Sequence, residues 1–175
     1  MRKLNNNELE RITVQDFKNQ KKIPLTIILD DIRSAHNVGS IFRTSDAFLI
    51  KKIILCGITA SPPNRGIYKS SLGATKSVEW EYRNDKIEAI KQLKDQKNYI
   101  IGVEQTEKSC VLNELEIKDK SITIILGNEV NGVSQDAINL CDEVIEIPQF
   151  GTKHSLNVSV AAGLVIWEIY KKLKL

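Results

Sequence analysis

The sequence EVIEIPQFGTKHSLNVSVAAG, at residues 143–163, places a polar loop between two strongly apolar segments. Its first part predicts a buried strand over residues 144–147, and Pro148 then opens the loop. A helix is expected to begin near Ser155, and because residues 156–167 are apolar on nearly all sides, we expect most of its surface to be buried. A polar loop held between two packed elements is a strong candidate for a ligand-binding segment.

Outside this stretch, apolar runs rich in β-branched residues predict four more strands. These strands are expected at residues 24–30, 52–56, 98–103 and 121–126. The expected N-caps of three helices are Asn37, Asp85 and Ser134. Residues 57–77 are rich in Gly, Pro and Ser, and we expect them to form a long loop that is functional or mobile. The alternation of apolar strands with helices predicts an α/β fold around a mostly parallel sheet.

The length and charge of the chain limit the classes of protein to which it can belong. Its 175 residues suffice for one domain with a hydrophobic core, which we expect to span residues 24–175. Residues 1–23 carry six Lys or Arg against three acids, and they predict a basic leader with a short helix based on Leu9, Ile12 and Phe17. A net charge of +3 permits an anionic partner without requiring one.

The sequence predicts neither membrane insertion nor metal binding. No apolar stretch is long enough to span a bilayer, and no signal peptide follows the first Met, so we expect a cytoplasmic protein. The three cysteines are widely spaced without a Cys-x-x-Cys pair, which indicates neither a disulfide framework nor a zinc site. Neither a dinucleotide-binding fingerprint nor a P-loop is present.

Polar residues follow the predicted strands, where ligands of open α/β sheets bind. These segments are residues 31–37, 104–106, 127–132 and 148–157. Arg43 lies one turn after Gly39 on the same expected helix, and we expect the missing side chain at Gly39 to let the guanidinium reach back toward the strand ends. The alternative for an isolated helical Arg is a surface ion pair.

Three separated motifs in this chain resemble those of one protein family. They are NVGSIFR at residues 37–43, LGNEVNG at 126–132 and IPQFGTKHSLNVSVA at 147–161. In this order they are similar to the motifs of the SpoU (TrmH-type) branch of the SPOUT RNA methyltransferases. The resemblance implies a C-terminal trefoil knot, a homodimer, S-adenosylmethionine as the cofactor, and methyl transfer to a ribose 2′-hydroxyl of RNA.

The same resemblance implies roles for individual residues. Arg43 would be the catalytic arginine, and it would be supported by Asn37, Glu129, Ser155 and Asn157. The backbone around a second set would hold the cofactor, namely Glu104, Gly127, Ile147, Pro148 and Leu156. Because a guanidinium stays protonated, we expect Arg43 to orient the RNA and stabilise the developing alkoxide rather than to act alone as a general base. Two simpler roles remain open: Glu129 capping the turn after it, and Asn157 accepting from helix-start amides.

Four basic residues are candidates for contact with RNA: Arg65, Lys69, Lys76 and Lys153. Gln149, within Ile-Pro-Gln, is similar to its counterpart in eukaryotic tRNA ribose methyltransferase domains, so tRNA is the first expectation, with a guanosine of the D-loop as the target. Ribosomal RNA is the alternative substrate. A catalytically silent RNA-binding or assembly factor with the same fold is the alternative function.

Overall fold

The computed structural model describes residues 1–117 and 121–174, which fold around a seven-stranded sheet in the order β3-β2-β1-β6-β4-β7-β5. The strands are β1 (Ile23–Asp30), β2 (Ile50–Cys56), β3 (Glu79–Arg83), β4 (Tyr99–Val103), β5 (Cys110–Val111), β6 (Ile122–Leu126) and β7 (Glu143–Glu146). Neighbouring strands pair in parallel throughout the described sheet, so the predicted α/β fold around a mostly parallel sheet is confirmed.

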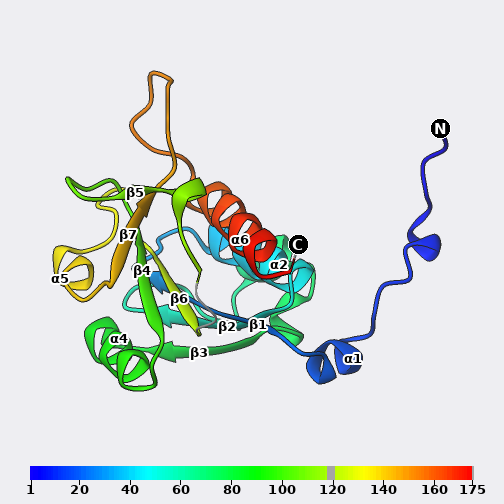
Figure 1. Cartoon of the computed structure of the whole chain (residues 1–175). Coiled ribbons are helices and arrows are strands. Elements are labelled where there is room, and N and C mark those ends of the chain that lie inside the picture. Colours follow the sequence, from blue (N-terminus) through cyan, green and yellow to red (C-terminus); the bar gives the residue numbers. More distant parts are fainter. Residues whose placement is uncertain (118–120, 175) are drawn as a thin grey trace.

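Helices cover both faces of this sheet (Figure 1). The α-helices are α1 (Val14–Asn19), α2 (Ala35–Ala47), α3 (Arg65–Ser71), α4 (Lys86–Asp95), α5 (Gln135–Ile138) and α6 (Val158–Lys174), and the short 3-10 turns are η1 (Asn6–Glu8), η2 (Ala74–Lys76) and η3 (Leu112–Glu114). Ile27 and Leu29 of β1 pack in the larger core with α2 and α6, whereas Ile28 packs in a second core with α4. A central strand that is apolar on both faces is what a sheet between two helical layers requires.

The sequence did not predict two strands, and both depend on their neighbours. The edge strand β3 is rich in polar residues, but Lys52 of β2 lies 3.1 Å from Glu79 and 2.8 Å from Glu81, so its ammonium group holds the two strands together. The other, β5, has only two residues and pairs with β7. Neither strand has the apolar run by which a buried strand is predicted.

Two expectations about the helices near the start of the chain were wrong. Ser34, rather than Asn37, is the N-cap of α2, and its hydroxyl accepts from the backbone N–H of Asn37. Residues 57–77 are not one loop, because they contain α3 and η2. The side chain of Asn64 starts α3 by accepting from the N–H groups of Gly66 and Ile67 at 2.8 and 3.4 Å.

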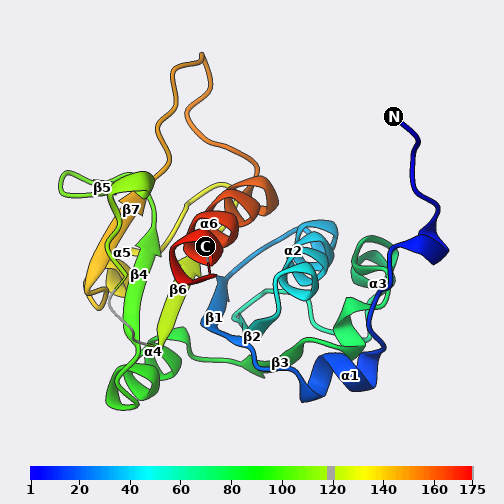
Figure 2. The same ribbon diagram turned by 45° about the vertical axis from the view of Figure 1, so that its right-hand side comes forward.

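Gly39 serves close packing of α2 on α3, which lie side by side (Figure 2). A Cβ at Gly39 would lie 2.1 Å from the hydroxyl oxygen of Ser70 and 2.5 Å from the carbonyl oxygen of Ile67. The expectation that Gly39 makes room for Arg43 is therefore wrong. The missing side chain faces the neighbouring helix, while Arg43 is exposed to solvent.

The C-terminal helix is less enclosed than the sequence predicted. It begins at Val158, and it carries an exposed apolar row of Val160, Leu164 and Trp167, which are 52%, 43% and 44% exposed. The expectation that most of its surface is buried was thus wrong for this side. No helix of the described residues is long and apolar enough to cross a bilayer.

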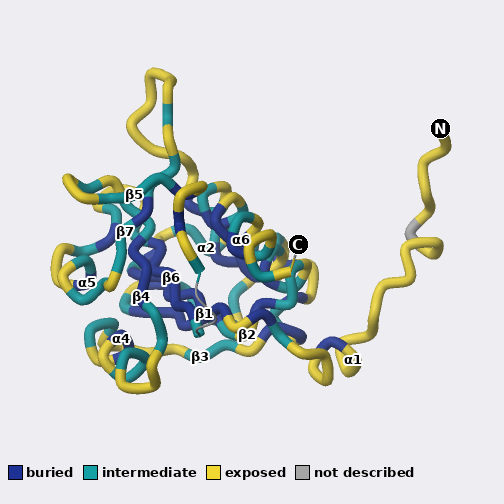
Figure 3. Tube along the Cα trace, in the orientation of Figure 1, coloured by how far each residue is buried: buried dark blue, intermediate teal, exposed yellow. Residues whose placement is uncertain are grey.

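The N-terminal segment attaches to the body through one short helix. Phe17 of α1 is buried, whereas Leu9 and Ile12 lie before the helix and are exposed (Figure 3). The predicted short helix exists, but only one residue of its expected apolar stripe packs. Residues before α1 run outward from the sheet (Figures 1 and 2).

Gly39→Ala is expected to destabilise the protein by about 1–3 kcal/mol, because the carbonyl of Ile67 belongs to the backbone of α3 and cannot rotate away from a new methyl group. Gly163→Ala is the matched control, since this helical glycine has nothing within 4 Å of its ideal Cβ. Alanine there should be neutral or stabilise by up to about 1 kcal/mol. Urea unfolding of both variants measures the difference, and equal stabilities would contradict the packing role of Gly39.

Candidate functional site

A pocket of about 450 Å³ lies at the carboxyl ends of β4, β6 and β7. Its walls come from the segments that follow these strands and from both ends of the loop between β7 and α6. This volume is within the range of small-molecule sites in proteins. Of the residues expected to surround the cofactor, four line the pocket: Glu104, Gly127, Ile147 and Leu156. Pro148, the fifth, is exposed and does not line it.

Backbone atoms come unusually close together beside this pocket. A Cβ at Gly127 would lie 2.1 Å from the carbonyl carbon of Gly132, and one at Gly132, where φ is +66°, would lie 2.1 Å from a carboxylate oxygen of Glu104. The Glu104 carboxylate accepts from the N–H groups of Val133 at 3.0 Å and Gln105 at 2.8 Å. The side chain of Glu104 therefore supports the loops of the pocket.

Glu129 links the loop after β6 to the start of α2. Its carboxylate accepts from the backbone N–H of Arg33 at 2.8 Å, from that of Ser34 at 3.1 Å and from the side-chain amide of Asn37 at 2.8 Å. Partial burial raises the pKa of Glu129, but these N–H donors outweigh it, so the pKa lies below its ordinary value. The alternative that Glu129 caps the turn after it was wrong, since its partners precede and begin α2.

The carboxylate of Glu129 also determines how two amide side chains are oriented. A carboxylate only accepts hydrogen bonds, so Asn37 presents its NH₂ group to Glu129 and its oxygen to the NH₂ group of Asn157, 3.2 Å away. The oxygen of Asn157 then accepts from the N–H and hydroxyl groups of Ser159 at 2.9 and 2.6 Å. The simpler role of Asn157 at a helix start is thus confirmed, and the same side chain also contacts Asn37.

Arg43 and Ser155 lie outside this hydrogen-bonded group. Arg43 is exposed on α2, six residues or about 9 Å along the axis beyond Asn37. It makes no hydrogen bond or ion pair with any residue in the described ranges. Ser155 is exposed and lines the pocket together with Glu129. The structure therefore brings Asn37, Glu129 and Asn157 together, while the expected catalytic arginine faces solvent.

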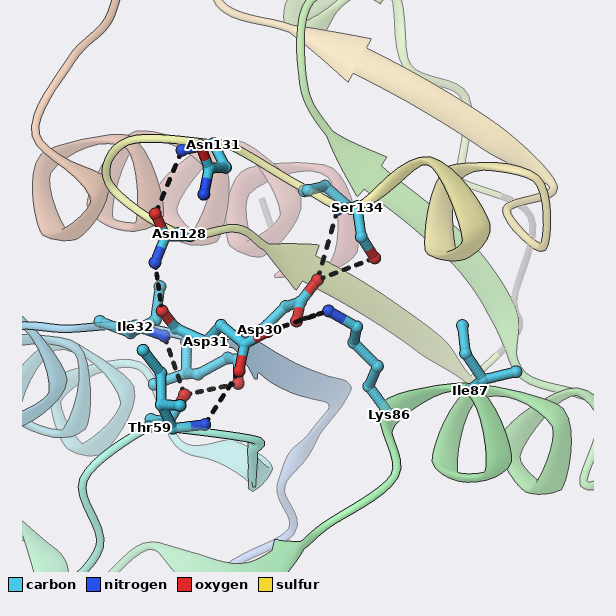
Figure 4. A network of polar contacts seen from close by, with 12 residues as sticks. Asp30, Asp31, Ile32, Thr59, Lys86, Ile87, Asn128, Asn131 and Ser134 are labelled. Carbon is cyan, nitrogen blue, oxygen red and sulfur yellow. Dashed lines mark hydrogen bonds and ion pairs between the residues drawn. The ribbon is translucent and has the colours of Figure 1, made fainter.

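We did not predict the buried acidic network that lies at the end of β1 (Figure 4). Asp30 is only 1% exposed, and the ammonium group of Lys86 lies 2.6 Å from Asp30 and 3.0 Å from Asp31. Ser134 donates to Asp30 through its hydroxyl at 3.3 Å, and Asn128 donates to the carbonyl of Asp31 at 2.6 Å. Two adjacent acids at the end of an apolar strand are the sequence signal by which this cluster could have been found.

Two pKa values reflect this network. The backbone N–H of Ile58, followed by Lys86, holds the pKa of Asp31 below its ordinary value. Burial lowers the pKa of Lys86, but its hydrogen bonds to Asp30 and Asp31 outweigh that effect, so the pKa of Lys86 is raised. Both groups are therefore held in their charged forms.

The basic residues expected to contact RNA are spread over the surface. Arg65 begins α3 beside the start of α2, because a Cβ at Gly66 would lie 3.0 Å from that of Ala35. Lys69 follows one turn later. Lys76 lies near the far end of α2, since the adjacent Ser77 donates to Asp46. Lys153 is exposed in the loop between β7 and α6, which projects from the body of the protein (Figure 1).

The fold and the pocket define an α/β domain with a ligand site at the carboxyl edge of a parallel sheet, where proteins of this architecture bind nucleotides and cofactors. No group of His, Cys, Asp or Glu that could hold a metal ion occurs within residues 1–117 and 121–174. The model of the SpoU rRNA Methylase family matches residues 24–167. The chain belongs to this family.

Individual relatives agree with this assignment. A Staphylococcus epidermidis protein assigned to the TrmH family of tRNA/rRNA methyltransferases is 33% identical over 159 residues, which are 91% of this chain and 63% of that protein. The chain therefore spans less than two thirds of the length of that relative. The A. aeolicus TrmH/SpoU tRNA modifying enzyme has a similar structure, with a TM-score of 0.81 and 24% identity over 91% of this chain and 81% of that one. The structure of AviRb from Streptomyces viridochromogenes, a SpoU methyltransferase in complex with AdoMet, is also similar. Its TM-score is 0.80 and its sequence identity is 23%, over 90% of this chain and 64% of the AviRb chain.

Glu129→Gln is expected to lower the free energy of unfolding at neutral pH by about 1 kcal/mol, because an amide accepts hydrogen bonds less strongly than a carboxylate and the group is exposed. The folded-state pKa of Glu129 is lowered, so its contribution is complete above the ordinary pKa and is lost as the pH falls through the folded-state value. Urea unfolding of both proteins between about pH 7 and pH 3 should show the gap closing on the acid side. A gap that does not change with pH would rule out this role.

Proposed function

We propose that the protein is an S-adenosylmethionine-dependent RNA 2′-O-ribose methyltransferase. One observation carries the proposal: residues from all three sequence motifs, Asn37, Glu129 and Asn157, meet in one chain of hydrogen bonds at the edge of a cofactor-sized pocket. The bonded pairs are 92 and 120 residues apart in the sequence, so we do not expect unrelated surface residues at such separations to be hydrogen-bonded in series.

The pocket fits the cofactor in size and in the chemistry of its walls. Apolar side chains of Val103, Ile147 and Leu156 line the pocket without being fully buried, so they offer a surface for a flat ring. When bound, S-adenosylmethionine supplies a methyl group activated by its positive sulfur. Glu104, Gly127, Ile147 and Leu156 are the residues whose loops would hold it, with Pro148 next to them outside the lining.

The role of the polar residues follows from their charges. Arg43 has no hydrogen-bond or ion-pair partner among the residues that the structure describes, so its guanidinium is available to orient the RNA backbone and stabilise negative charge as the ribose hydroxyl loses its proton. Asn37, Glu129 and Asn157 keep the start of α2 and the start of α6 in fixed positions beside the pocket. Ser155 supplies a hydroxyl in the pocket wall itself.

The position of Arg43 supports a homodimer. Arg43 does not line the pocket of its own chain, so it needs either a large movement or a second copy to reach a bound cofactor. The exposed apolar row of α6, at Val160, Leu164 and Trp167, lies on a helix that contacts α2 and offers a surface for a second copy. The C-terminal trefoil knot implied by the motifs belongs to the same proposal, as does a cytoplasmic location.

For the substrate we propose tRNA, with a D-loop guanosine as the first target to examine. Ribosomal RNA is the second candidate, since the S. epidermidis relative is assigned to a family of tRNA and rRNA methyltransferases. Arg65, Lys69 and Lys153 are the proposed contacts to RNA phosphates, and Lys76 is the most remote of the four basic residues proposed from the sequence.

Incubation of the purified protein with labelled S-adenosylmethionine and total tRNA or rRNA should yield 2′-O-methylated nucleosides. Arg43→Ala should lower kcat/KM by at least about 100-fold, because it removes charge stabilisation made in the transition state. Calorimetric titration should show cofactor affinity within about twofold of the wild-type value. Arg83→Ala is the control, since Arg83 is also exposed but is paired with Glu81 at 3.0 Å on the edge strand.

Two results would count against this assignment. Absence of 2′-O-methyl nucleosides with both RNA classes would reject the reaction and favour a silent RNA-binding factor. Loss of cofactor binding in Arg43→Ala equal to the loss of transfer would show that the arginine supports the pocket instead.

Arg65→Ala should weaken RNA binding more than Lys76→Ala, because Arg65 adjoins the start of α2 while Lys76 lies near its far end. A lost phosphate contact reduces the slope of log affinity against log salt by about 1. Gel-shift titrations at several salt concentrations would measure both effects. Equal affinities and slopes for the two variants would place the RNA path elsewhere.

A further inference from the structure

The loop between β7 and α6 forms part of the pocket only at its two ends. Gln149 at one end and His154, Ser155 and Leu156 at the other line the pocket. The middle rises away from the body, and the side chain of Phe150 is 96% exposed (Figures 1 and 3). Such a segment has few packing contacts to hold it in place, so its position depends on its remaining tethers.

One hydrogen bond connects residues 148–156 of this loop to another part of the described chain. The side-chain NH₂ group of Gln105 donates to the carbonyl oxygen of His154 at 2.9 Å. Gln105 also lines the pocket, as His154 does. It therefore joins two walls of the same pocket.

The two walls joined by this bond differ in how firmly they are held. On the side of Gln105, the backbone N–H donates to Glu104 at 2.8 Å, and Glu104 is bonded in turn to Val133 at 3.0 Å. The adjoining β4 pairs with both β6 and β7. Gln105 thus extends from a fixed edge of the sheet to a loosely held loop.

We propose that Gln105 is a positioning residue that holds the loop of residues 148–156 closed against the cofactor pocket. The identity of the ligand rests on the proposed function, but the tether itself does not. Without the bond, the loop samples open conformations, and the ligand has to order it on binding. Gln105 therefore sets the affinity for the cofactor and has little effect on the methyl transfer step once the pocket is filled.

The test compares Gln105→Glu with Gln135→Glu. Both changes place a carboxylate of nearly the same shape in the lining of the pocket. Within the described part of the chain, however, the side chain of Gln135 bonds only to Asn139, next to its own helix, at 2.9 Å. A carboxylate at position 105 cannot donate to the carbonyl of His154, so it removes the tether. Gln105→Lys keeps an N–H donor and should restore it.

Three readouts are measured on the full chain. Hydrogen–deuterium exchange without ligand should be faster over residues 149–156 in Gln105→Glu than in the wild type, Gln135→Glu or Gln105→Lys. Titration with S-adenosylmethionine should show affinity about three- to tenfold lower in Gln105→Glu than in Gln135→Glu, the range that one neutral hydrogen bond provides. At saturating cofactor, kcat for methyl transfer should stay within about twofold of the wild-type value, whereas KM for the cofactor rises.

Exchange over residues 149–156 that is equal in Gln105→Glu and the wild type would overturn the proposal. An equal loss of affinity in Gln105→Glu and Gln135→Glu would overturn it too, because charge alone would then explain the effect. Failure of the wild-type protein to bind S-adenosylmethionine would reject the proposed function instead, and the exchange comparison would still decide whether Gln105 holds the loop.

Discussion

A buried carboxylate at the end of β1 constrains the elements around it at the carboxyl edge of the sheet. Asp30 is almost fully buried, so its charge has to be matched by neighbouring donors or the fold would lose several kcal/mol, on the order reported for unpaired buried ions. Lys86 and Ser134 supply those donors from the first residue of α4 and from the N-cap of α5. Two helices on the same face of the sheet are thereby positioned relative to β1.

The constraint extends from Asp30 to the functional loops through its neighbour. Asp31 has a positive φ of 57°, and its carbonyl accepts from Asn128, the residue before Glu129. Glu129 in turn accepts from the backbone N–H groups of Arg33 and Ser34, just before α2 begins. The loop after β6 is therefore bonded to the segment between β1 and α2 through two successive residues. The orientation of the Asn37 and Asn157 side chains follows from the position of Glu129. Asn37 has to donate its NH₂ group to the carboxylate, so its oxygen is left to accept from the NH₂ group of Asn157.

The sequence predicts the interior of this fold well because the central strands carry their own signal. Apolar runs locate β1, β2, β4, β6 and β7, since a strand covered on both faces needs no polar positions. Short or polar edge strands cannot be found in that way, because they are held by pairing with a neighbour. A helix such as α3, in a stretch rich in Gly and Ser, depends on one capping side chain and on tertiary burial.

The candidate site was predictable as a set of residues and much less so as a geometry. The motifs identify Asn37, Glu129 and Asn157, but no spacing argument shows which amide donates to which acceptor across 92 or 120 residues of chain. Gly39 shows the opposite failure. A glycine near an arginine is compatible with clearance for that arginine or with close helix packing, and only the position of α3 decides for packing.

The walls of the pocket differ in how many interactions hold them in place. This difference suits a site that must exchange its ligand. The walls after β4 and β6 are held by the carboxylate of Glu104 and by glycines whose backbone atoms are in close contact, so they cannot open without breaking several interactions. In the wall after β7, residues 148–156 are joined to other parts of the described chain by a single neutral hydrogen bond. Opening that wall costs the least free energy, so ligand entry and release should follow this path while the polar groups beside the pocket keep their geometry.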